Sequence, residues 1–272
     1  MKRIVSIQDI SCIGKCSQTV SIPIISSMGI EIAILPTAIL STHTAFENPT
    51  FKNLAQEAKN IMKHWKKENF QFDLIYIGYT GTEEILDLVI NFINEFKTEK
   101  NVVVFDPAMA DHGKLYSGIN KNVVEKIKEV CKKADYLRLN TTEASILLEK
   151  EYKENFIQKE AEKMAKLLEK LGPKRIIITG IEKKEKIGAI GFDGEEYYSN
   201  FEEKYDVSYP GTGDIFTSAI AGCLVKEKTM EEAIKIATKF TTECVRISYG
   251  NKRETKYGTN FEEAIPYLIK ML

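Results

Sequence analysis

Short runs of β-branched and other apolar residues alternate with longer amphipathic segments along the chain. Because the short runs are apolar at nearly every position, they predict strands that are buried on both faces. Strands and helices that alternate in this way form a parallel sheet covered by helices on each side. We therefore predict a three-layer α/β/α sandwich with a mostly parallel central sheet. The predicted strands are Arg3–Ile7, Ile30–Leu35, Leu74–Gly78, Val102–Phe105, Tyr136–Leu139, Arg175–Thr179 and Ile187–Phe192.

The clearest helical pattern is Glu83–Phe96, where the apolar residues recur on one face. A second helix is predicted from Ala161 to Leu171, because Gly172-Pro173 is a typical helix stop. Three more helical patterns follow at roughly 214–226, 230–248 and 260–271. No repeat or linker interrupts the chain, so residues 1–272 are predicted to form a single domain.

The charges of the chain nearly cancel, with 38 basic and 39 acidic residues. This balance argues against a nucleic-acid partner or a membrane surface, since both favour an excess of basic residues. No apolar run reaches the ~18 residues of a membrane helix, and the amino terminus does not resemble a signal peptide. The odd number and wide spacing of the cysteines predict reduced thiols: Cys12, Cys16, Cys131, Cys223 and Cys244. We expect a cytoplasmic protein that binds a small molecule.

Polar or glycine residues follow nearly every predicted strand. In a parallel sheet, ligands bind beyond the carboxyl ends of the strands, where these residues would meet. They are Gln8-Asp9, Ser41–Thr44, Gly78-Tyr79, Asp106-Pro107, Asn140–Glu143 and Thr179-Gly180.

The turn Gly211-Thr212-Gly213-Asp214 leads directly into an apolar helical run. Glycines beside a helix start allow several N–H groups to point at one place, and the helix dipole adds positive charge there. Such an anion hole suits a transferring phosphoryl group, and Asp214 beside it could accept the proton of an attacking hydroxyl. The alternative is that Asp214 only caps the helix. A Walker motif is absent, because Cys16 follows Gly14-Lys15 and Asp9 stands where the first glycine is required.

Seven short segments, taken in order, carry a resemblance to a known family. They are Ser6–Asp9, Leu40–Thr44, Ile77–Gly81, Phe105–Met109, Leu139–Glu143, Ile178–Gly180 and Gly211–Asp214. Their order and spacing, across nearly the whole chain, resemble the ribokinase-like superfamily and specifically its pyridoxal/pyridoxamine (vitamin B6) kinases. The resemblance implies an ATP-dependent kinase of ribokinase-like fold, usually a homodimer, that needs Mg²⁺ and commonly a monovalent cation such as K⁺.

The resemblance also implies roles on the nucleotide side of the site. Asp214 would be the general base, and Gly211, Thr212 and Gly213 would form the anion hole. Asp106 and Glu143 would organise Mg²⁺ and its waters, supported by Asn140, in keeping with the preference of Mg²⁺ for oxygen ligands. Thr179 and Gly180 would border the nucleotide. Asp111 and Tyr116 would belong to a flap over ATP, predicted as a loop within Ala108–Gly118.

The vitamin side of the site would be built from Asp9, Ser41, His43, Thr44 and Tyr79. Tyr79 could stack on a pyridine ring, although it could also be an ordinary core aromatic, and His43 could be a structural histidine. Asp9 departs from the family, in which serine is common at this position. A carboxylate there could pair with a protonated pyridine nitrogen or an amine, so Asp9 bears on substrate preference.

Three other functions are weighed against a vitamin B6 kinase. A hydroxymethylpyrimidine kinase of the same superfamily typically carries cysteine where Asp214 stands. A sugar or nucleoside kinase usually has a Gly-Gly pair near residue 35, which is absent. A binding protein without catalysis would be expected to have lost carboxylates such as Asp106, Glu143 and Asp214, all of which are present.

Overall fold

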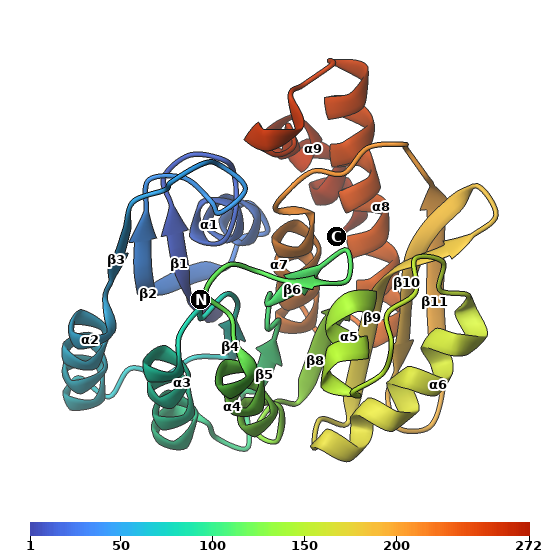
Figure 1. Cartoon of the computed structure of the whole chain (residues 1–272). Helices are drawn as coiled ribbons and strands as arrows, with labels where there is room; N and C mark the ends of the chain where they lie inside the picture. The colour runs from blue at the N-terminus through green and yellow to red at the C-terminus, as the bar shows by residue number, and fades with distance from the viewer.

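The computed structural model describes all residues, 1–272, and is built around a nine-stranded sheet. The strands lie in the order β11-β10-β9-β8-β5-β4-β1-β2-β3 (Figure 1). Their bounds are β1 Arg3–Ser11, β2 Glu31–Leu40, β3 Phe51–Asn53, β4 Leu74–Ile77, β5 Val102–Phe105, β8 Tyr136–Asn140, β9 Arg175–Lys183, β10 Lys186–Phe192 and β11 Tyr197–Glu203.

The six strands from β2 to β9 in this order are parallel. Antiparallel pairing occurs only toward the two edges, between β2 and β3 on one side and among β9, β10 and β11 on the other. This confirms the predicted mostly parallel sheet. Three strand ends are nevertheless wrong in the prediction. β2 continues to Leu40 rather than ending at Leu35. β1 continues to Ser11, so Asp9 lies within the strand, where the pairing with β2 shifts register between Gln8 and Ile10. β9 continues to Lys183, so Thr179 and Gly180 also lie within a strand.

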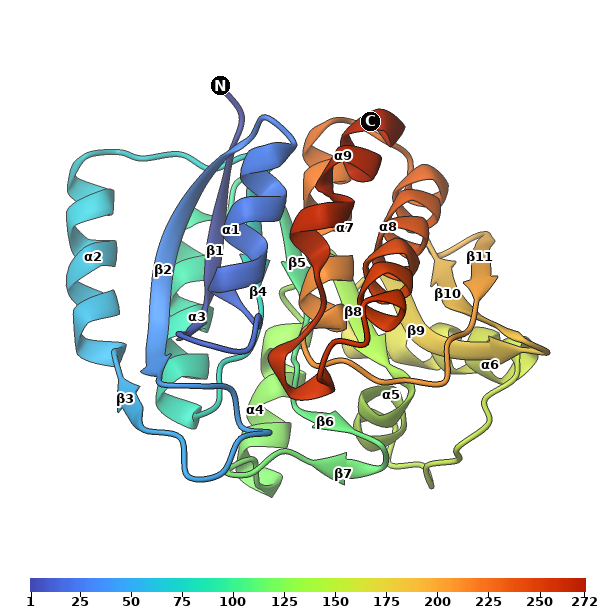
Figure 2. The ribbon, with the colours of Figure 1, turned by 90° about the horizontal axis from the view of Figure 1, so that it is seen from above.

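Two layers of helices cover the two faces of the sheet (Figure 2). One layer holds α1 Gln18–Ser27, α7 Thr212–Val225, α8 Met230–Gly250 and α9 Phe261–Met271; the other holds α2 Ala55–Lys67, α3 Glu83–Phe96, α4 Lys121–Cys131, α5 Thr141–Leu147 and α6 Gln158–Leu168. Each layer packs on the sheet through its own apolar core, so the three-layer sandwich is confirmed. Two 3-10 turns complete the chain, η1 Glu169–Leu171 and η2 Thr255–Tyr257.

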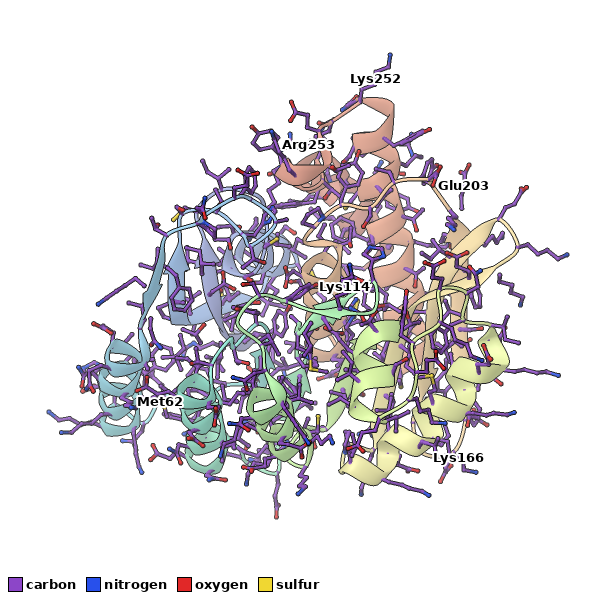
Figure 3. All side chains as sticks on the ribbon, viewed as in Figure 1. Met62, Lys114, Lys166, Glu203, Lys252 and Arg253 are labelled. Atoms are coloured by element: carbon purple, nitrogen blue, oxygen red, sulfur yellow. The ribbon has the colours of Figure 1, made fainter.

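The segment Ala108–Gly118 forms a small hairpin of β6, Ala110–Asp111, and β7, Lys114–Leu115. The prediction of an irregular loop is therefore wrong in part. Figure 3 shows Lys114 on this hairpin near the middle of the molecule. Figure 2 places the hairpin at the edge of the sheet where the central strands end, together with the segments before β3 and after α8. Ligands of parallel sheets bind at this edge.

None of the helices has both the length and the apolar character needed to span a membrane. All five cysteines are free thiols, and Cys131, Cys223 and Cys244 are buried.

Candidate active site

The predicted anion hole lies at the amino terminus of α7. Gly211 precedes the helix with a φ of 81°, in the left-handed region that favours glycine. The first backbone bond of the helix runs from the Ile215 N–H to the Gly211 carbonyl, at 3.0 Å. The N–H groups of Thr212, Gly213 and Asp214 precede that bond and have no acceptor within the helix. They form the cluster of donors that an anion could bind.

Asp214 does not cap its own helix. The residue at the cap position is Gly211, and Asp214 is the third residue of α7. Its Oδ2 instead accepts a hydrogen bond of 2.9 Å from the backbone N–H of Ser17, which precedes α1. The structure thus removes the capping alternative and leaves the second carboxylate oxygen, Oδ1, with no hydrogen bond from the protein.

The surroundings of Asp214 make its carboxylate more basic than usual. Burial, together with the nearby carboxylates of Asp106 and Asp9, raises the pKa of Asp214 to about 7, although the Ser17 N–H bond and the charge of Arg138 act to lower it. A general base works best when its pKa lies close to the operating pH.

Asp106 is buried just beyond the end of β5 and is held by two side chains. Arg138 Nη1 donates to both carboxylate oxygens, at 3.3 and 3.1 Å, and Thr217 Oγ1 of α7 donates to Oδ2 at 2.6 Å. Arg138 Nη2 also donates to Thr179 Oγ1 at 2.7 Å. These bonds join the residue after β5 to the interior of β8 and β9 and to the first turns of α7.

Glu143 connects the start of α5 to the segment that leads into the hairpin. Its Oε1 accepts from the Met109 N–H at 2.9 Å, and its Oε2 accepts from the Asn140 N–H at 2.8 Å. Asn140 Oδ1 accepts from the Glu143 N–H in return, and Asn140 Nδ2 donates to the Ala110 carbonyl at 2.7 Å. Burial and the charge of Asp106 raise the pKa of Glu143.

The carboxylates of Asp106 and Glu143 suit a Mg²⁺ ion that keeps most of its waters. They are hard oxygen donors in the same cluster, yet both already accept hydrogen bonds from the protein. No three His, Cys, Asp or Glu side chains gather as a cage for a metal ion.

The remaining nucleotide-side residues are not all brought together. Tyr116 is partly buried, and burial and the charge of Glu143 raise its pKa, so it lies close to the carboxylate cluster. Asp111 is exposed at the tip of the hairpin, where its carboxylate lies 3.6 Å from His112 Nε2. Gly180 is exposed, with a φ of 78° and open space beside its Cα.

On the vitamin side, Asp9 lies close to both Asp214 and Tyr79. Asp9 is buried and accepts a bond of 3.0 Å from Ser11 Oγ, and burial raises its pKa. Its charge acts on both Asp214 and Tyr79, which is partly buried.

The loop residues of the vitamin side are bonded to backbone. Both ring nitrogens of His43 are engaged, since Nε2 bonds the Lys256 carbonyl at 2.8 Å and Nδ1 accepts from the Ala45 N–H at 3.2 Å. Burial lowers the pKa of His43, which favours the neutral ring. Ser41 and Thr44 are exposed, and Ser41 Oγ accepts from the Thr50 N–H at 2.9 Å. His43 therefore has an evident structural role, and a substrate contact by it or by Ser41 or Thr44 stays a prediction.

A family profile described as phosphomethylpyrimidine kinase matches residues 32–260. The chain belongs to this family.

Members of the phosphomethylpyrimidine kinase family and their relatives match most of the chain. A pyridoxal kinase from Dictyostelium discoideum is 26% identical over 259 residues, covering 86% of this chain and 83% of that one. A hydroxymethylpyrimidine/phosphomethylpyrimidine kinase from Aquifex aeolicus is 29% identical over 201 residues, covering 72% and 73%. A crystal structure from Bacteroides thetaiotaomicron, described as a phosphomethylpyrimidine kinase and containing pyridoxal, superposes with a TM-score of 0.93 at 33% identity, covering 98% and 95%.

Three residues of this candidate site are missed by the sequence prediction: Ser17, Arg138 and Thr217. Arg138 carries the one signal that could have been noticed, a positive charge inside an otherwise apolar strand, Tyr136–Leu139. Ser17 and Thr217 give no such signal. Ser17 bonds the carboxylate of Asp214, 197 residues away in the sequence, and Thr217 bonds that of Asp106, 111 residues away.

Proposed function

We propose that the protein is a pyridoxal kinase that transfers the γ-phosphoryl group of ATP to the 5′-hydroxymethyl group of a B6 vitamer. The observation that carries this proposal is Asp214, a carboxylate of raised pKa beside the free N–H groups of α7. As the hydroxyl oxygen attacks the γ-phosphorus, Asp214 accepts its proton, and the bond from that phosphorus to the ADP oxygen breaks. The N–H groups of Thr212 and Gly213 meet the charge on the phosphoryl oxygens.

Two observations favour a B6 vitamer as the substrate. The relatives that cover most of the chain include a pyridoxal kinase, and the Bacteroides structure contains pyridoxal. In addition, Asp9 places a carboxylate near Asp214, where it could pair with a protonated pyridine nitrogen.

Mg²⁺ is proposed as the partner of ATP, organised through water by Asp106 and Glu143 with Asn140 beside them. When bound, the metal would neutralise charge on the transferring phosphates. The hydrogen bonds of Glu143 and Asn140 to Met109 and Ala110 support a link between this place and the hairpin over the site. A single catalytic domain, a homodimer and a cytoplasmic location complete the proposal, and the single nine-stranded sheet supports the first of these.

Hydroxymethylpyrimidine phosphorylation is the second candidate, favoured by the family description and by the Aquifex relative. The resemblance to B6 kinases counts against it, because the pyrimidine kinases typically carry cysteine where Asp214 stands. A coupled assay of ADP release with pyridoxal, pyridoxamine, pyridoxine and hydroxymethylpyrimidine separates the two. Turnover of the pyrimidine alone would overturn the proposed function.

The activity should depend on pH through Asp214. Only the deprotonated carboxylate can accept the hydroxyl proton, and its pKa is raised to about 7. We therefore expect kcat/KM to rise with pH, by about tenfold per unit, until it levels off above about pH 7. The measurement is kcat/KM between pH 5 and 9 at saturating Mg²⁺. A profile that is flat across this range would contradict a base with this pKa.

Replacing Glu143 with glutamine should weaken the binding of MgATP by about tenfold. Each oxygen of Glu143 accepts a backbone N–H, and glutamine would turn an NH₂ group toward one of these donors. The link to Met109 would then loosen as the negative charge is lost. The control is Glu149→Gln, because Glu149 is exposed and bonds only Lys128. Equal MgATP affinity in the two variants, measured by calorimetry, would remove Glu143 from the nucleotide site.

A further inference from the structure

Arg138 brings a positive charge into the interior of the molecule. It lies in the central strand β8 with 8% of its surface exposed, and no other lysine or arginine is buried. Its guanidinium bonds Asp106 on one side and Thr179 on the other, with Cζ 5.8 Å from the centre of the Phe216 ring. A Cβ placed on Gly213 would lie 2.9 Å from Arg138 Nη1. The guanidinium therefore packs directly against the backbone of the predicted anion hole.

The carboxylates around this guanidinium outnumber it. Asp106 is bonded to it, and the charges of Glu143 and Asp214 also interact with Arg138. Carboxylates this close would repel one another and any phosphate, unless a cation stands among them. Arg138 provides that cation permanently, since a guanidinium stays ionised in proteins.

Structural stabilisation alone does not account for this arrangement. A buried ion pair is often no more stabilising than apolar residues of the same volume. The Arg138 Nε is also buried without an acceptor, which typically costs about 1–3 kcal/mol. A pair kept only for stability would be expected to satisfy that donor.

The K⁺ ion implied by the family resemblance does not fit among these groups. A monovalent cation would need several free oxygen atoms near the anion hole. The side-chain oxygens next to the guanidinium belong to Asp106 and Thr179, and the guanidinium already bonds both residues and occupies the space between them. Thr179 Oγ1 in turn donates to the Leu139 carbonyl at 3.3 Å.

We propose that Arg138 is the built-in cation of the phosphoryl-transfer site, a positioning residue that holds Asp106 and Gly213 in place and makes K⁺ dispensable. This inference rests on the proposed kinase function. Arg138 acts through the backbone of Gly213 and the carboxylate of Asp106, and its charge also favours the deprotonated form of Asp214.

The first test uses the wild-type enzyme with K⁺ and Na⁺ replaced by tetramethylammonium at equal ionic strength. We expect kcat to change by no more than about twofold, because the guanidinium charge is independent of salt composition. A fall of about tenfold or more that is reversed by K⁺ would overturn the inference, since it would show that the site lacks its cation. Calorimetry of MgATP binding under the same two conditions gives a readout that needs no turnover. If no vitamer is phosphorylated, the proposed function fails, but the binding measurement still tests the inference. A MgATP affinity that depends on K⁺ would overturn the inference, and an affinity that does not depend on K⁺ would support it.

The second test compares Arg138→Met with Arg138→Lys. Methionine fills similar volume without charge, so kcat should fall by about 10²-fold, whereas lysine should keep more activity. The midpoint of the kcat/KM pH profile should also move upward in Arg138→Met, a change that a purely structural role would not produce. Arg175→Met is the control, since Arg175 begins the neighbouring strand β9 and stacks on Tyr136, 5.1 Å from the ring centre. Wild-type kcat and an unmoved pH midpoint in Arg138→Met would overturn the inference. If that variant does not fold, the lysine variant and the wild-type salt series decide.

Discussion

The substitution Asp214→Asn should lower kcat by about 10²–10⁴-fold, the contribution typical of a general base. Asparagine keeps the size of the side chain but cannot take the proton of the attacking hydroxyl. Its amide oxygen can still accept the Ser17 N–H, and Gly211 rather than Asp214 holds the cap position of α7. The melting temperature should therefore change little, and MgATP should still bind. The dependence of kcat/KM on pH near 7 should also disappear.

Three measurements on the same protein separate this result from general damage. They are kcat with the preferred vitamer, MgATP affinity by calorimetry, and the melting temperature. Asp87→Asn is the control, because Asp87 is an exposed residue of α3 that pairs only with Lys126. If Asp214→Asn kept a kcat close to that of the Asp87 variant, the role of Asp214 as the base would be refuted.

The parts of the fold predicted from the sequence are those with a strong apolar pattern. The helix Glu83–Phe96 has the same bounds in the sequence and in the structure, because its apolar face is continuous and Thr82 caps its start. Helix α1 is absent from the prediction, because Gln18–Ser27 mixes apolar and polar residues without a distinct apolar face and contains Pro23. Strand β11 was missed for the opposite reason, because Tyr197–Glu203 is a mostly polar edge strand that forms by pairing with β10.

The candidate site was predictable where a residue follows the end of a parallel strand. Asp106 and Asn140 lie at such ends, and the shared direction of the strands brings them to one edge. The same reasoning gives no position for a residue on a loop. His43 is oriented by the carbonyl of Lys256, 213 residues away, and nothing in the local sequence announces that bond. Arg138 lies outside the predicted site because it is inside a strand, where reasoning from strand ends does not reach. A charge in a central strand is nevertheless unusual and therefore informative.

The substitution Gly211→Ala should lower kcat by about 10²-fold or more, because it displaces the donors of the anion hole. Two separate effects act at this position. Alanine at a φ of 81° costs of order 1–3 kcal/mol in backbone strain. Its Cβ would also lie 2.0 Å from the carbonyl oxygen of Lys15, so the turn between β1 and α1 or the start of α7 must move. Ser17, which bonds Asp214, belongs to the same turn.

Gly29→Ala isolates the first effect from the second. Gly29 follows α1 with a φ of 76° and has nothing within 4 Å of an added Cβ. Both variants should therefore lose stability through backbone strain, and only Gly211→Ala should also lose activity. The measurements are the free energy of unfolding in urea and kcat for each variant. Gly211→Ala and Gly29→Ala could instead lose equal stability and both keep the wild-type kcat. The turn at Gly211 would then tolerate displacement, and the N–H groups of α7 could not be the donors that bind the phosphoryl group. A loss of kcat confined to Gly211→Ala would tie that turn to the chemistry, since the strain common to both variants cannot produce it.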